Sequence, residues 1–252
     1  MKQPQPLRIN VLGEPAINTW TNTTWHPWKY RNTPHIATFM VVHGNTATAD
    51  QLTETFWPNR PRLRQPLHAR TNDFNASIPN SDRHLESLAG PNGWTYRLHN
   101  TRSDYHELLT LDRYIRHAPA GTDLDYYRWN ILNSVYGVPL DGIDAPWADD
   151  TRHQLQTIIR RHGLTLAHNA HHHHAWRCAL ETCRRLERAQ AITPDDPEWE
   201  DLIQIRQRSA LGTCDPLDMT REGLAPDSTV TNARWPTNPH PLPLSREERE
   251  AA

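Results

Sequence analysis

The sequence predicts an α+β segment followed by an all-α segment. Short alternating stretches precede three helical patterns before residue 80, a hairpin pattern follows before residue 100, and helical periodicity alone continues from residue 104 to 208. We therefore expect two domains, at 7–100 and 104–208, and a proline-rich, largely irregular tail at 211–252. The low apolar content of 36% suits two small domains better than one large body.

The first residues of the expected α+β segment alternate as short strands do. Leu7, Ile9 and Val11 alternate with Arg8, Asn10 and Leu12 up to Gly13, and a second run lies at 15–20. The aromatic residues behind them are typical of a third strand, or of a surface on which a ligand stacks: Trp25, Trp28 and Tyr30. We expect a small antiparallel sheet ahead of the helices.

Two helices are then indicated by apolar residues at helical spacing: Ile36, Phe39 and Met40 in the first, Ala49, Leu52 and Phe56 in the second. Residues 43–45, with a glycine and an asparagine, end the first helix. Thr48, followed three positions later by Gln51, is a capping-box pattern that starts the second, and Trp57 with Pro58 closes it.

The third expected helix, at 64–78, carries the clearest functional pattern. Its apolar face is formed by Leu67, Thr71, Phe74 and Ile78. The opposite stripe contains Gln65, His68 and Asn72, with Arg64 and Asn75 at its margin. Because asparagine and glutamine amides match adenine in the major groove, this stripe predicts a surface that contacts base edges.

The charge distribution near this helix also favours contact with nucleic acid. The whole chain has a formal charge of −2, but residues 55–72 contain no acid and four arginines: Arg60, Arg62, Arg64 and Arg70. Arginines placed at a recognition helix and the loop before it suit contacts with phosphates. The same pattern is also typical of a solvated helix face.

A hairpin follows the third helix. Residues 90–93 form a dense turn pattern, after which Trp94, Tyr96 and Leu98 alternate with polar residues. A sheet, three helices and then a hairpin is the order of a winged helix-turn-helix domain with an N-terminal sheet. Arg97, near the predicted wing, is a candidate contact to a phosphate or to the minor groove.

The segment after residue 104 contains five helical patterns. They lie at 105–117, at 123–135, around Leu155 and Leu166, at 176–186, and from Asp195 to Ile203. Paired helices of this size, joined by short loops, predict a helical-repeat domain that presents a groove to a protein partner.

Other patterns exclude several functions. Three cysteines, no signal-peptide core and no long apolar run indicate a cytoplasmic protein that does not span a membrane. The histidines at 171–174, with His162 and His168 nearby, suggest a metal site, but adjacent histidines cannot all face one ion, so we expect none. We find no phosphate loop or catalytic motif and expect no enzyme activity, catalytic residue or cofactor.

Several of these passages together resemble a known family. They are the strand at 7–13, the passage at 47–58 that ends Phe-Trp-Pro, the Tyr-Gly-Val-Pro-Leu passage at 136–140, and the Trp147-Ala148 pair. The chain resembles the bacterial transcriptional activator domain proteins, the architecture of the Streptomyces antibiotic regulatory protein family, over roughly residues 7–205.

The resemblance implies an OmpR-like winged helix that binds repeats in promoter DNA, followed by a tetratricopeptide-like domain. It further implies a recognition helix at 64–78, RNA polymerase as a partner contacted near 59–63, and dimerisation or contact with the transcription machinery through the helical domain. The chain departs from the family at 72–75, where members carry basic residues and this chain has Asp73. That departure motivates an alternative, a protein-interaction scaffold whose winged helix no longer binds DNA specifically.

Overall fold

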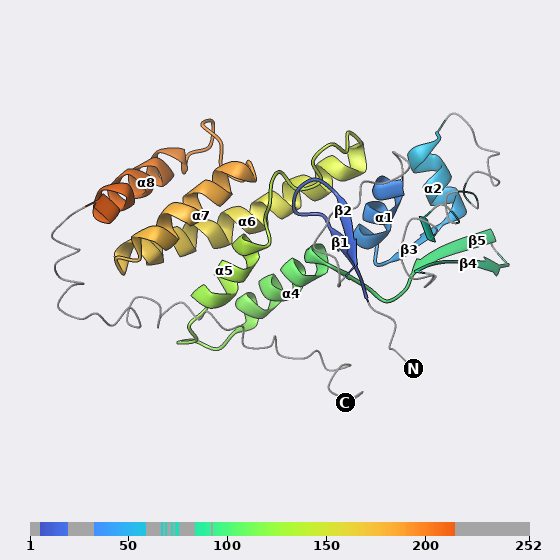
Figure 1. Ribbon diagram of the computed structural model, residues 1–252, viewed down its shortest axis with the longest axis horizontal. Coiled ribbons are helices and arrows are strands. Elements are labelled where there is room, and N and C mark those ends of the chain that lie inside the picture. Colours follow the sequence, from blue (N-terminus) through green and yellow to red (C-terminus); the bar gives the residue numbers. More distant parts are fainter. Residues whose placement is uncertain are drawn as a thin grey trace.

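The computed structural model describes residues 6–19, 33–58, 84–91 and 93–214, together with Leu67, Ala69, Asn72, Phe74 and Asn75. Strands and helices both occur up to residue 103, and helices alone follow (Figure 1). The expected order of an α+β segment and then an all-α segment is thus confirmed. We call residues 7–103 the N-terminal half and residues 104–214 the helical half.

The first sheet combines strands from both ends of the N-terminal half. Its order is β2 (Ala16–Thr19), β1 (Leu7–Asn10) and β6 (Thr101–Ser103). β1 pairs antiparallel with β2, as expected, but parallel with β6. The prediction of an antiparallel sheet is therefore wrong at this edge. Parallel strands need a long connection, and here the helices and hairpin between β1 and β6 supply it.

The second sheet has the order β3-β5-β4, with all neighbours antiparallel. Its strands are β3 (Thr46–Thr48), β4 (Leu85–Gly90) and β5 (Gly93–Leu98). The expected hairpin is confirmed as β4 and β5, with Tyr96 and Leu98 buried on its inner face. β3 lies between α1 (Thr33–Val42) and α2 (Ala49–Phe56), and its three residues are too few to show an alternation in the sequence.

Local signals define α1 and α2. After α1, Gly44 and Asn45 adopt positive φ values of 77° and 65°, which glycine and asparagine tolerate best. At the start of α2 the capping box forms as expected: the Gln51 backbone N–H donates to Thr48 Oγ1 at 3.1 Å, and the Thr48 backbone N–H donates to Gln51 Oε1 at 2.9 Å.

The helical half contains α4 (Asp104–His117), α5 (Asp125–Asn133), α6 (Pro146–His172), α7 (Trp176–Arg188) and α8 (Trp199–Cys214). α6 begins with proline in its first turn, where the missing N–H costs no hydrogen bond. α8 continues to Cys214, beyond Leu211, where the sequence pattern suggested that the regular structure ends. The rest of the expected tail lies outside the described residues.

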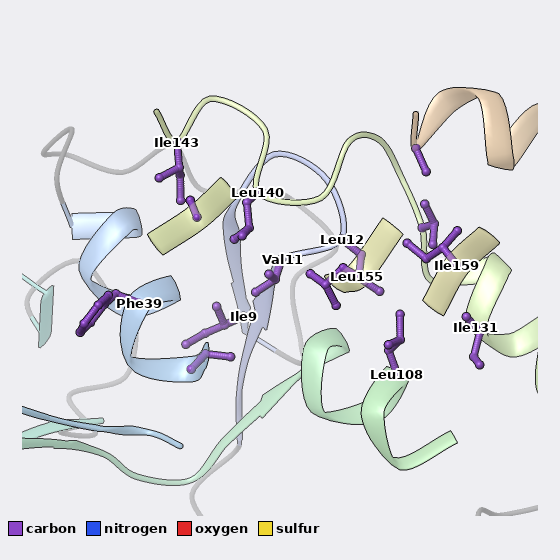
Figure 2. Close-up of a cluster of buried hydrophobic side chains, with 14 of the residues drawn as sticks. Ile9, Val11, Leu12, Phe39, Leu108, Ile131, Leu140, Ile143, Leu155 and Ile159 are labelled. Carbon is purple, nitrogen blue, oxygen red and sulfur yellow. The ribbon is translucent and has the colours of Figure 1, made fainter. Parts of the chain in front are cut away.

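Buried side chains of both halves form one continuous cluster. Figure 2 shows Ile9, Val11 and Phe39 of the N-terminal half in the same cluster as Leu140 and Leu155 of the helical half. Phe39 of α1 meets Trp147 of α6 edge-to-face, with ring centroids 5.2 Å apart. The two expected domains therefore share a core.

Candidate nucleic-acid interface

The third helical segment is described at five residues. Leu67 and Phe74, seven positions apart, are buried in the core cluster, whereas Ala69 and Asn72 are exposed. This arrangement is amphipathic: the apolar face fastens the segment to the fold, and Asn72 faces outward. The side chain of Asn72 is therefore accessible to solvent.

Unlike Asn72, Asn75 has a side chain that is hydrogen-bonded within the fold. Its Nδ2 donates to the Leu85 carbonyl at 2.9 Å, and its Oδ1 accepts from the backbone N–H groups of His84 and Leu85 at 3.1 and 3.0 Å. These three hydrogen bonds tie the third helical segment to the start of β4. We therefore leave Asn75 out of the proposed base contacts, because its amide already serves the backbone.

We expect Asn75→Ala to lower the free energy of unfolding by about 1–3 kcal/mol, because half-buried backbone groups lose their partners. Asn72→Ala is the matched control: it is the same substitution three positions earlier on the exposed side, and its effect should stay within about 0.5 kcal/mol. Urea denaturation of both variants measures the difference. Equal losses would contradict the tethering role of Asn75.

Arg97 is exposed on β5, on the face of the sheet opposite Tyr96. In the hairpin register it lies across from Glu86, four residue pairs from the turn at Gly90 and Gly93. At about 3.3 Å per residue, it is roughly 13 Å from the tip of the hairpin. Arg97 thus sits at the base of the predicted wing and beside a carboxylate.

The remaining predicted contacts lie outside the described residues. They are Arg60, Arg62, Arg64, Gln65, His68 and Arg70. Leu67 and Ala69 fall among them in the sequence and are helical.

A buried carboxylate lies where the two halves meet, and no pattern in the sequence indicated it. Asp104, the first residue of α4, is 0% exposed, and its carboxylate accepts the backbone N–H groups of Val11 at 2.8 Å and Leu12 at 3.1 Å. The partners are more than 90 positions apart, so only the fold brings them together. In the sequence, Asp104 resembles an ordinary acid in the first turn of a helix.

A second buried carboxylate joins α4 to α6. Asp112 Oδ1 is 2.8 Å from Nε2 of the buried His162, and the Asp112 carboxylate also pairs with Arg116 and Arg161. Because Asp112 is ionised and acts as acceptor, His162 Nε2 carries the hydrogen. His162, which the sequence placed near the histidine run, belongs to this cluster instead.

The histidine run ends α6 and the turn behind it. His171 Nδ1 lies 3.0 Å from Ser209 Oγ, and His168 Nε2 lies 2.8 Å from a carboxylate oxygen of Asp201, so both connect α6 to α8. Among the described residues, no three histidine, cysteine or acidic side chains converge as metal ligands would. Burial raises the pKa of Cys178 to about 11 and that of Cys183 to about 12, which keeps both thiols protonated.

Comparison with models of known protein families finds no match, and comparison with curated proteins finds none either. Within the described part of the chain, no helix is both long enough and apolar enough to cross a membrane.

Proposed function

We propose that this protein is a transcriptional regulator that binds promoter DNA through a winged helix-turn-helix in its N-terminal half. The order of elements supports the proposal most directly. α1, β3, α2, the helical segment that contains Leu67 and Phe74, β4 and β5 follow one another, and β3 pairs with β5 beside β4. A winged helix has this order, and its third helix enters the major groove.

The polarity of the third helical segment supports the same function. Leu67 and Phe74 hold one side of it in the core, so the opposite side faces solvent at Asn72. An asparagine on an outward helix face can pair bidentately with adenine. We therefore assign base recognition to the predicted stripe of Gln65, His68 and Asn72.

The four arginines at 60–70 supply the charge that such a helix needs. Contacts with phosphates provide the sequence-independent part of the affinity, and they make it depend on salt. The helical half then serves dimerisation or contact with the transcription machinery, as the resemblance to bacterial transcriptional activator domain proteins implies. Its partners on this account are promoter repeats, RNA polymerase and a second copy of the chain.

Binding to DNA fragments from upstream of neighbouring genes, measured over a range of salt concentrations, tests the proposal. The double variant Arg64→Ala/Arg70→Ala should weaken binding to every fragment and reduce the slope of log affinity against log salt by about 1 for each lost phosphate contact. Asn72→Ala should instead reduce the preference for the specific fragment by about 1–3 kcal/mol with little change in slope. Weak, equal binding to all fragments, unchanged in these variants, would overturn the proposal.

A second candidate function is a protein-interaction scaffold. Exposed acids on α2, Asp50 and Glu54, favour it because they would repel a DNA backbone that approached this helix, and Asp73 adds a third acid nearby in the sequence. Under this function the full chain binds no promoter fragment. It instead captures a defined partner, and substitutions on exposed helices of the helical half abolish the capture while Arg64→Ala/Arg70→Ala does not.

A further inference from the structure

The outward face of α7 carries a row of arginines. Arg177, Arg184 and Arg188 follow one another at intervals of seven and four positions, so they share one face of the helix, and all three are exposed. At about 1.5 Å per residue, the row extends over roughly 16 Å. Cys183 and Leu186, on the opposite face, are buried in the core cluster. We call the three exposed residues the arginine row.

The acids of α7 leave most of the charge of this row in place. Glu181 Oε1 accepts from Arg185 Nε at 2.9 Å, and its other carboxylate oxygen lies 3.8 Å from Arg184 Nη1. Glu187 faces α8 and accepts from Arg206 Nη1 at 2.6 Å. Within the described residues, no acid pairs with the first or the last member of the row. The arginine row therefore presents an excess of positive charge to solvent.

Partly exposed apolar groups lie beside the row. Leu180 lies one turn from the first two members of the row, on the same side of α7. Toward α5, the guanidinium of Arg185 lies over the ring of Trp129, 5.5 Å from its centroid, and donates to the Leu132 carbonyl at 2.9 Å. Trp129 is thereby held next to the arginine row. Tryptophan and arginine are the residues enriched where protein interfaces gain most of their affinity.

We propose that the arginine row, with Leu180 and Trp129 beside it, binds an acidic segment of a protein partner. Carboxylates pair with guanidinium groups through two parallel hydrogen bonds, and apolar side chains of the segment pack on the leucine and the tryptophan. A protein segment fits this surface better than DNA does, because Glu181 beside the row repels phosphates and apolar groups border it.

The position of α7 suits a partner that binds apart from the DNA. In Figure 1, α7 lies toward the end of the molecule opposite β4 and β5, the strands of the proposed wing. The inference rests on the partner-binding role that we propose for the helical half, and it names the chemistry of that partner. It does not depend on DNA binding.

Titration of the full chain with a synthetic peptide tests the surface. The peptide is as long as α7 and carries glutamate and leucine at helical spacing, and its counterpart has glutamine in place of glutamate. In nuclear magnetic resonance spectra, the glutamate peptide should shift the amide resonances of residues 177–188 and the indole N–H of Trp129. The glutamine peptide should bind about tenfold more weakly. Absence of binding, equal binding of the two peptides, or shifts confined to other parts of the chain would overturn the proposal.

Charge reversal distinguishes a local surface from the effect of overall charge. Arg188→Glu should weaken binding of the glutamate peptide about tenfold, because it places a repelling charge in the row. Arg113→Glu is the matched control: it makes the same change in net charge at an exposed arginine of α4 that pairs with no acid in the described part of the chain. Its effect should stay below about twofold, because salt screens a charge outside the contact. Equal losses in the two variants would contradict a specific surface.

Two further measurements identify a different occupant. Displacement of the peptide from the row by a duplex DNA fragment would mean that the row binds nucleic acid. Self-association in sedimentation that Arg188→Glu abolishes would mean that a second copy of the chain covers it. Either result would overturn the proposal. Because the peptide titration contains no DNA, its failure is distinguishable from failure of the promoter-binding assay with Arg64→Ala/Arg70→Ala.

Discussion

Replacing Asp112 with alanine is expected to lower the free energy of unfolding by about 3–5 kcal/mol, because it removes one partner from a buried ion-pair cluster and leaves the others without an acceptor. His162 is buried beside the missing carboxylate, and its Nε2–H would have no acceptor in the interior. Arg116 and Arg161 are partly exposed, so water can compensate them. The loss therefore comes mainly from the Asp112 and His162 pair.

The pH dependence of this cluster follows from the pKa shifts of Asp112 and His162. Burial acts to raise the pKa of Asp112, but the hydrogen bond from His162 and the charge of Arg161 outweigh it, so the pKa falls below 3.8. For His162 burial acts in the other direction: it lowers the pKa below 6.5, and the hydrogen bond to Asp112 only partly opposes this shift. Both groups have depressed pKa values, so acidification removes stability: first below pH 6.5, as the unfolded state protonates His162, and then below 3.8.

An exposed pair between α6 and α8 offers a matched control. Asp201 and His168 are separated by 2.8 Å, like Asp112 and His162, but both are about half exposed. Asp201→Ala should therefore change the free energy of unfolding by no more than about 1 kcal/mol. Urea denaturation at pH 7 compares the two variants. If both variants lose the same small amount of unfolding free energy, burial does not make the Asp112–His162 pair more important for stability than the exposed pair.

Local patterns in the sequence were sufficient to predict most of the helices. The capping box of Thr48 and Gln51 forms because both partners lie within one turn, and α7 follows its apolar spacing from Trp176 to Leu186. The hairpin of β4 and β5 was predictable because its turn and its alternation are also local.

Features that depend on distant partners were not predictable. β6 is three residues long, and only its pairing with β1, more than 90 positions away, makes it a strand. Asp104 and Asp112 have helical neighbours in the sequence, but the buried partners Val11 and His162 lie 93 and 50 positions away from them.

The same limit applies to the candidate interface. A helical wheel places Asn72 and Asn75 on neighbouring stripes, and both have the side chain that recognises adenine. Asn75 differs only because β4 begins beside it, ten positions further along the chain. A side-chain amide on a predicted recognition helix is thus a candidate for DNA contact only when it is not hydrogen-bonded to nearby backbone groups.

Because the two halves share a core, we expect replacement of Phe39 to have a large effect on stability. This side chain is 5% exposed, and its ring contacts Phe56 of α2 and Trp147 of α6 edge-to-face, with centroids 5.7 and 5.2 Å away. Phe39→Ala should lower the free energy of unfolding by about 3–5 kcal/mol, because it removes an aromatic ring from a packed site and leaves a cavity between three helices. Phe39→Leu should cost less, because it keeps most of the apolar volume.

Because Phe39 lies between the halves, its loss should affect them together. Urea denaturation followed by tryptophan fluorescence, to which Trp147 contributes, and by far-ultraviolet circular dichroism, which reports mainly the helices, should give coincident transitions in the wild type and in Phe39→Ala. Leu211, 72% exposed on α8, provides the control, since Leu211→Ala should shift neither transition by more than about 0.5 kcal/mol. A variant in which fluorescence shifts while the helical signal stays unchanged would mean that the halves fold separately. The edge-to-face contact of Phe39 with Trp147 would then belong to an interface between two domains that fold independently.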